Sequence, residues 1–420
     1  MKPKGIVGEA ATLVSGNMLA QAIALAAYFV LTRIYTPEDY GLFNIFYSYI
    51  EVLIIFSTCK YELAIVVADD EREAAAVGRF ALRLNVVVSV LLLTVALALW
   101  LTGALPGNFA QLGWMVLLVP PMVFFCGTSR VYSFLYNRFH RYAQIALSDN
   151  VNAGVGAVAK IALGLLGFSH SGMPVGTVVG QAASNINYRL RLRSLRLPAV
   201  DAAASRAAAT KHRNFPCFVA TKDLVNTFSS NLPFLWAALY FERAEVGLFG
   251  LALTFTMQPV NLLSSAFERV LYARTAEAVR GRRPALHLLL RFLGILLAVA
   301  VPVCVLAWFL AEPVFVFCFG DRWQGCGPFV QALLPLVLVG LCSTSIMFVS
   351  NVFSTQRTEF VFFLVLLVLR VAAMAVGIGA ADFVLTIGLY AAAGTLVQAS
   401  LLLWYLWQMR RYERSLTRQN

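Results

Sequence analysis

The stretch RIYTPEDYGLF occupies residues 33–43, and the stretch RAEVGLF occupies residues 243–249. Each stretch joins two long apolar runs, and a shift of 206 residues aligns their Gly-Leu-Phe triplets. The same shift places Glu62 on Glu268. The sequence therefore predicts two related halves of one polytopic membrane protein. Membrane bundles duplicated in this way place a substrate path at the interface of their repeats.

The composition supports a membrane protein, because 60% of the 420 residues are hydrophobic and only 13% are charged. A hydrocarbon core about 30 Å thick requires about 20 residues of helix. The apolar runs predict helices at residues 10–33, 41–66, 80–102, 113–135, 143–167, 174–190, 215–241, 246–271, 287–310, 328–350, 360–379 and 383–407. The expected fold class is therefore an all-α polytopic membrane protein with about twelve transmembrane helices. Two six-helix bundles, related as a parallel repeat, would surround a central cavity.

The net charge of +12 follows membrane orientation and does not indicate a nucleic-acid partner. With the N-terminus inside, the outer loops contain only Arg33, Arg243 and Arg322, whereas most Lys and Arg residues fall in inner segments. This asymmetry predicts that both termini are cytoplasmic.

The basic, alanine-rich stretch between the sixth and seventh helices is the natural boundary between the halves. We expect an N-terminal bundle at 1–195, a basic cytoplasmic linker at 196–213, a C-terminal bundle at 214–409 and a basic cytoplasmic tail at 410–420. The linker and the tail fit a topology anchor better than a site for anionic lipid headgroups.

Polar residues form a stripe on the predicted helix at 143–167. Asp149, Asn152, Gly156 and Lys160 follow one another at helical spacing. Charge inside a membrane is costly and usually faces a protein interior or a water-filled cavity. We therefore favour a central cavity for this stripe over an outward-snorkelling Lys160.

The first helix of each predicted half also contains polar residues. Asn17 and Gln21 lie on the helix at 10–33, and Lys222 and Asn226 lie on the helix at 215–241. Pro233 should kink the latter helix, because proline removes a backbone donor. This kink is a candidate gate, and a static kink is the alternative.

Several interior charges suggest functional roles. Arg130, Lys160 and Arg370 have no acidic residue nearby in the sequence, so with Lys222 they predict a basic path for an anionic ligand. Lys60 with Glu62, and Lys222 with Asp223, are expected to neutralise each other in part. The candidate ion-coupling residues are Glu51, Glu62, Asp149 and Asp223. For the polar faces that include Glu51 and Glu62, contacts between helices remain an equal alternative to cavity lining.

The sequence contains no phosphate-binding loop, no nucleophile–base constellation and no metal-ligand spacing. It therefore predicts neither an enzyme nor a cofactor. Cys318 and Cys326 flank an outer loop, where a disulfide and two free thiols both remain open.

The stretches TPEDYG at 36–41 and YELAIV at 61–66 now support a family. The chain resembles the oligosaccharide flippase branch (O-antigen and related polysaccharide transporters) of the multidrug/oligosaccharidyl-lipid/polysaccharide exporter superfamily. Lys60 stands where the family usually has Arg. The resemblance covers nearly the whole chain and implies two six-helix bundles around a cavity that opens to one side at a time.

The resemblance also implies the activity. The expected substrate is an undecaprenyl-pyrophosphate-linked oligosaccharide, moved from the cytoplasmic to the periplasmic leaflet of a bacterial inner membrane. Membrane lipids, a polysaccharide polymerase and a ligase are expected partners. Two alternatives remain: a cation-coupled multidrug exporter of the same superfamily, and a membrane scaffold for glycan assembly that transports nothing itself.

Overall fold

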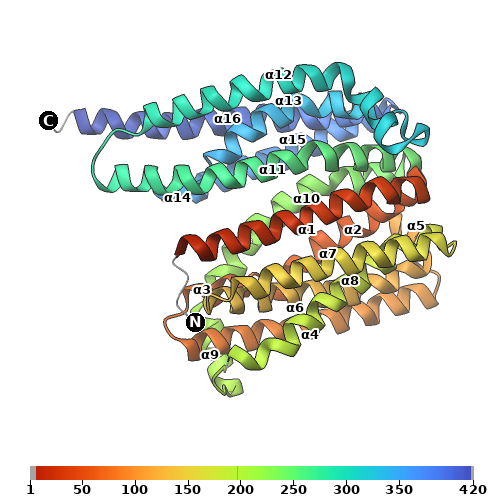
Figure 1. Ribbon diagram of the computed structural model, residues 1–420, viewed down its shortest axis with the longest axis horizontal. Coiled ribbons are helices and arrows are strands. Elements are labelled where there is room, and N and C mark those ends of the chain that lie inside the picture. Colours follow the sequence, from red (N-terminus) through yellow and green to blue (C-terminus); the bar gives the residue numbers. More distant parts are fainter. Residues whose placement is uncertain (1–5, 196, 418–420) are drawn as a thin grey trace. The chain divides into compact units, whose positions relative to one another are not determined.

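The structure is a computed structural model that describes residues 6–195 and 197–417, and none of these residues forms a strand. It contains two compact units, Met1–Thr227 and Phe228–Asn420 (Figure 1). The division lies within α10 (Thr221–Leu235), beyond the predicted linker at 196–213. Each unit is described by itself below.

The first unit contains six long helices among its described residues. They are α1 (Ile6–Ile34), α2 (Pro37–Thr58), α4 (Glu71–Leu101), α6 (Val119–Arg138), α7 (Tyr142–Leu165) and α8 (Ser169–Leu192). Shorter segments connect them: α3 (Tyr61–Val67), α5 (Asn108–Leu112), the 3₁₀ turns Gly113–Leu118 and Arg193–Leu195, α9 (Ala202–Lys211) and a π-helical turn at Phe215–Ala220.

The second unit begins within α10 and continues through five more long helices among its described residues. They are α11 (Arg243–Arg280), α12 (Leu286–Phe319), α13 (Cys326–Ser345), α15 (Gln356–Gly379) and α16 (Phe383–Thr417). The connecting segments are the 3₁₀ turns Ala237–Leu239 and Asp321–Trp323, and α14 (Val349–Val352).

Each predicted membrane segment overlaps one of these long helices. Seven of the described helical spans are long and apolar enough to cross a membrane: Pro37–Thr58, Glu71–Leu101, Phe109–Arg138, Leu286–Phe319, Cys326–Val352, Gln356–Gly379 and Phe383–Leu416. Several of the remaining long helices, such as α1, α7 and α10, contain the polar residues that the sequence singled out for function.

The helices differ from the apolar runs in several places. The predicted helix at 41–66 is broken between α2 and α3, because Cys59 and Lys60 adopt left-handed conformations with φ of 46° and 62°. The predicted linker contains α9, which packs against α4. The predicted tail continues α16 as far as Thr417.

The TPEDYG motif forms the start of α2. Thr36 and Asp39 form a reciprocal capping box, in which each side chain accepts a hydrogen bond from the other's backbone N–H. Pro37 occupies the first turn, where its missing N–H costs nothing. The buried Asp39 carboxylate also accepts a hydrogen bond of 2.7 Å from His170 Nδ1, which fixes the α1–α2 turn to the start of α8.

Helices α7 and α8 lie side by side and pack closely through small residues (Figure 1). Gly172, Gly176 and Gly180 occur at every fourth position of α8 and so share one helix face. A Cβ on Gly180 would lie 2.7 Å from the carbonyl oxygen of Asn152, so only glycine permits this approach. Small residues are the usual means by which membrane helices bring their backbones together.

Helix α9 is fixed to α4 by an ionic cluster outside the predicted membrane segments. Lys211 Nζ lies 2.6 Å from Glu73 Oε1, and His212 Nε2 lies 3.1 Å from the same oxygen. Lys211 also contacts Asp69 at 2.7 Å. Burial acts to raise the pKa of Glu73, but hydrogen bonds from Lys211, the Asp69 backbone and His212 bring the pKa below its usual 4.5.

We expect the Glu73→Gln variant to lose at most about 1 kcal/mol of stability at neutral pH, the upper end for surface ion pairs. Because the folded-state pKa is lowered, this stabilisation is present above pH 4.5 and is lost as the pH falls through the lowered value. Thermal unfolding of the purified protein at pH 7 and at low pH measures the effect. The exposed Glu71→Gln variant is the control, and an equal deficit of Glu73→Gln at both pH values would contradict this assignment.

Candidate functional site

A polar cavity of about 290 Å³ lies in the first unit and is lined by α2, α6, α7 and α8. Its lining includes three charged residues, all of which the sequence had singled out or placed in the membrane: Glu51, Arg130 and Asp149. The other lining residues are Tyr47, Ile50, Ile54, Cys126, Ser129, Ser133, Asn152, Gln181, Ser184 and Tyr188.

The charges in this cavity come from three different helices. Glu51 lies on α2, Arg130 on α6 and Asp149 on α7, and each side chain is half-buried. One guanidinium and two carboxylates within a membrane bundle are costly to desolvate unless they neutralise one another or bind a ligand. The cavity can therefore accept an anionic group at Arg130 or a cation at the two carboxylates.

Hydroxyl and amide groups complete the cavity wall. Ser129 Oγ accepts hydrogen bonds of 2.9 Å from Gln181 Nε2 and from Asn185 Nδ2. Asn185 Nδ2 also donates to the Phe125 carbonyl at 2.8 Å. These bonds join α8 to α6 and hold the cavity walls in place.

Sequence reasoning missed the part of the wall that α8 provides. Gln181, Ser184 and Tyr188 follow one another at i, i+3 and i+7, which is one helical stripe. That spacing is a signal that could have found them.

The predicted stripe on α7 divides between two environments. Asp149 and Asn152 line the cavity. Lys160, in contrast, does not line it, and its ammonium lies 5.3 Å from the centre of the Phe43 ring. No carboxylate in the described part of the chain forms an ion pair with Lys160. The Phe43 ring, through this cation–π contact, is the electrostatic partner of the ammonium.

Arg370 is the most enclosed charge among the predicted residues of the second unit, with only 5% of its surface exposed. Its guanidinium lies 4.1 Å from the centre of the Tyr390 ring, and Nη1 donates to Ser229 Oγ at 3.2 Å. Its Nε atom is buried and has no hydrogen-bond partner among the described atoms. Arg370 is therefore a buried cation without a neutralising acid in the described residues of its unit.

The ion pairing of the acids near the α2–α3 break differs from the predicted pairing. Asp223 forms an ion pair with Lys60 at 2.6 Å, so Lys60 pairs with α10 and not with its neighbour Glu62. Glu62 is 1% exposed, and its Oε2 atom finds no hydrogen-bond partner in residues 6–195 or 197–417. The sequence could not predict this exchange, because it depends on the left-handed turn at Cys59 and Lys60.

The remaining candidate site residues with described side chains do not line the cavity. Gln21 lies on α1, and its buried Oε1 atom has no hydrogen-bond partner among the described residues. On α10, Lys222 is half-buried, Asn226 is exposed, and Pro233 is buried two residues before the helix ends. The side chain of Asn17 lies outside the part that the structure describes. The roles predicted for these residues remain predictions.

Metal and disulfide chemistry find no support in the described residues. No three His, Cys, Asp or Glu side chains there form a group able to hold a metal ion. All seven cysteines lie in the described part and are free thiols, so Cys318 and Cys326 are not joined.

Solved structures to which this chain is similar include a transporter and a lipid flippase. An inward-facing multidrug resistance MATE family transporter of the MOP superfamily is 13% identical, with a TM-score of 0.72 and coverage of 94% of this chain and 96% of that chain. The lipid II flippase MurJ, in an inward closed conformation, is 10% identical, with a TM-score of 0.74 and coverage of 96% and 90%. The fold is thus that of an all-α polytopic membrane protein, as predicted.

Residues 30–328 match the family described as polysaccharide biosynthesis protein, and the chain belongs to this family. No curated protein sequence matches the chain. The fold and the candidate spans indicate a multi-pass membrane protein, and the family places it in polysaccharide biosynthesis. The predicted membership of a polysaccharide biosynthesis family is therefore confirmed.

Proposed function

We propose that the protein is a flippase for polyprenyl-pyrophosphate-linked oligosaccharide repeat units in O-antigen, capsule or exopolysaccharide biosynthesis. It would move these lipids from the cytoplasmic to the periplasmic leaflet of a bacterial inner membrane by alternating access. The observation that carries the proposal is the polar cavity with Arg130 in its wall, within a member of a polysaccharide biosynthesis family.

The chemistry of the proposed path suits such a substrate. A guanidinium binds phosphate oxygens in a bidentate manner, so Arg130 and Arg370 are our candidates for the pyrophosphate. The amides of Asn152 and Gln181 and the hydroxyl of Tyr188 can donate to and accept from sugar hydroxyls. Lys160, Lys222, Asn17, Gln21 and Asn226 remain candidates for the same path, and Pro233 for its gate.

Glu51 and Asp149 are the favoured candidates for ion coupling, because both line the cavity beside Arg130. Protonation or cation binding at these carboxylates would change the net charge that an incoming pyrophosphate meets. Glu62 is a weaker candidate since it lies outside the cavity lining, and Asp223 is already paired with Lys60.

The orientation is also part of the proposal. The distribution of Lys and Arg supports an orientation with both termini in the cytoplasm. The basic linker and tail would then face the compartment in which the lipid-linked glycan is assembled. A polymerase and a ligase would act on the product after it reaches the periplasmic leaflet.

Cells that lack the gene test this proposal. We expect lipid-linked glycan intermediates to accumulate on the cytoplasmic face, with loss of the surface polymer. Wild-type protein should restore export, and Arg130→Gln should restore it about tenfold less well, as expected when about 1.4 kcal/mol of substrate interaction is lost. Arg83→Gln is the control, because Arg83 is exposed on α4 of the same unit.

A cation-coupled multidrug exporter is the second candidate, favoured by the two carboxylates in the cavity. It predicts an unchanged glycan profile and increased sensitivity to cationic drugs when the gene is removed. A glycan-assembly scaffold predicts something different again: export restored in full by every cavity variant that is still present in the membrane.

A further inference from the structure

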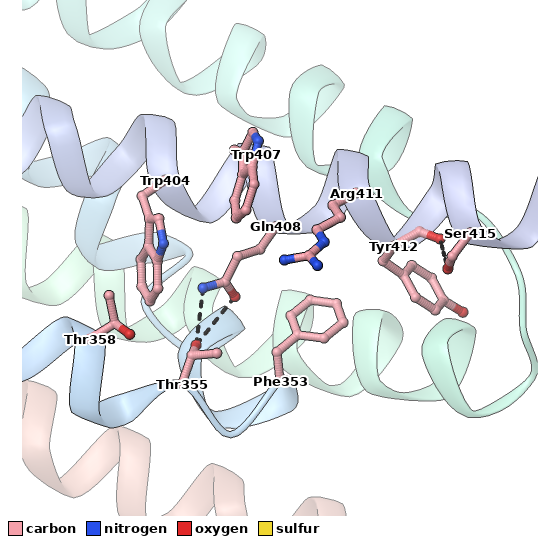
Figure 2. A pocket seen from close by; sticks show the side chains of 9 residues that line it. All are labelled: Phe353, Thr355, Thr358, Trp404, Trp407, Gln408, Arg411, Tyr412 and Ser415. Carbon is pink, nitrogen blue, oxygen red and sulfur yellow. Dashed lines mark hydrogen bonds between the residues drawn. The ribbon is translucent and has the colours of Figure 1, made fainter.

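A groove of about 450 Å³ lies in the second unit at the end of α16 that contains the C-terminal basic residues (Figure 2). Its walls come from α16, from the first turn of α15 and from the turn that precedes α15. The lining residues are Phe353, Thr355, Thr358, Trp404, Trp407, Gln408, Arg411, Tyr412 and Ser415. The groove thus has four aromatic residues in its walls and one cation at its side.

The aromatic wall has the composition of a membrane–water interface. Trp404 and Trp407 lie one turn apart on α16, near the end of its apolar span, and Trp407 is 54% exposed. Tryptophan and tyrosine concentrate at the depth of the lipid headgroups, where the ring is apolar and the N–H or O–H group remains wet. The wall therefore suits the glycerol region and the upper acyl chain of a lipid.

Arg411 provides an unneutralised positive charge beside this wall. Its guanidinium lies 5.4 Å from the centre of the Trp407 ring and is directed along the groove toward Gln408 and Phe353 (Figure 2). No carboxylate in residues 6–195 or 197–417 forms an ion pair with Arg411. The nearest acid in the sequence, Glu413, instead accepts hydrogen bonds of 2.8 and 2.7 Å from the backbone N–H groups of Ala285 and Leu286.

The floor of the groove is held in place by hydrogen bonds. Gln408 Nε2 donates to Thr355 Oγ1 at 3.0 Å and so joins α16 to the turn before α15 (Figure 2). The Tyr412 hydroxyl donates to the Val279 carbonyl at 3.2 Å and so joins α16 to α11. A groove with fixed walls loses little conformational entropy when a ligand binds.

We propose that this groove binds an anionic phospholipid of the surrounding bilayer. The headgroup phosphate would lie against Arg411, and the glycerol and upper acyl chain would lie against Trp404 and Trp407. Charge complementarity favours this occupant, because the exposed Arg410 and Arg414 add to the positive charge around Arg411. The site is separate from the cavity of the first unit and does not rest on the proposed glycan transport.

Native mass spectrometry of the full chain in detergent tests the proposal. The probes are phosphatidylglycerol and phosphatidylcholine with identical acyl chains. We expect the wild type to bind phosphatidylglycerol more tightly, and Arg411→Gln to weaken that binding about fivefold, the effect of one basic residue near an anionic surface. Trp407→Leu should weaken the binding of both lipids.

The matched control is Arg410→Gln, which removes the same charge from an exposed neighbour outside the groove. It should change the binding of phosphatidylglycerol less than about twofold, well below the effect of Arg411. Equal losses in the two arginine variants would overturn the proposal in favour of diffuse attraction to the basic tail. Equal binding of the two lipids by the wild type would overturn it too. Displacement of phosphatidylglycerol by an equal amount of polyprenyl phosphate would assign the groove to the glycan carrier lipid instead.

Discussion

Replacing Arg370 by methionine is expected to leave the protein at least as stable as the wild type while lowering polysaccharide export about tenfold or more. The physical reason is the burial of Arg370, which is 5% exposed and whose guanidinium contacts Ser229 and the Tyr390 ring. Burying a cation without a neutralising acid costs several kcal/mol, so an apolar residue of similar volume is often neutral or stabilising at such a site. If Arg370 had no role in transport, its replacement by an apolar residue would stabilise the protein without a functional cost.

Two measurements check this expectation in parallel: thermal unfolding of the purified protein, and surface polysaccharide in cells that express only the variant. Arg357→Gln is the control, because Arg357 lies on the same helix and is exposed. If Arg370→Met unfolds at a much lower temperature, Arg370 has a structural role. If export is unchanged in a stable variant, Arg370 has no role in transport.

The Tyr35→Ala variant is expected to lose about 3–5 kcal/mol of stability, the usual cost of removing a large buried aromatic side chain. Tyr35 is fully buried, and its hydroxyl donates to the Lys160 carbonyl at 2.7 Å. Its ring and hydroxyl occupy the space left open by Gly164 on α7 and Gly172 on α8. Tyr35 thereby ties the end of α1 to the tightest helix pair of its unit.

The Tyr35→Phe variant separates the ring from the hydrogen bond, because it should lose only about 1 kcal/mol. Gly172→Ala tests the same contact from the other side, since a Cβ there would lie 2.2 Å from the Tyr35 hydroxyl and force it to move. Thermal unfolding in detergent measures all three variants. Equal stability of Tyr35→Ala and Tyr35→Phe would show that the ring contributes nothing.

Apolar run length was enough to place every long helix, because a membrane span is set by the thickness of the hydrocarbon core. The same rule failed at helix ends. Helix α16 continues through Arg410 and Arg411 to Thr417, since a helix that has left the membrane still satisfies its own backbone hydrogen bonds. The break at Cys59 and Lys60 was also missed, because left-handed conformations at residues other than glycine leave little trace in the sequence.

The sequence predicted which charged residues lie at the candidate site better than it predicted the shape of the cavity. Charge in an apolar run is easily seen, so Arg130 and Asp149 were selected and both line the cavity. Lys160 shares a helical stripe with Asp149 but lies over Phe43 instead. Which part of a stripe meets a cavity depends on where neighbouring helices approach, and here the glycines of α8 set that approach.

The TPEDYG motif has a further consequence. Its threonine and aspartate cap a helix, its proline starts that helix, and the tyrosine before it wedges between two others. None of these atoms lines the cavity described in the first unit. Natural selection should therefore preserve this motif for its role in assembling the bundle, whatever substrate the protein carries. Relatives that carry quite different glycans would share it, and divergence among them should concentrate instead on the four helices that face the cavity.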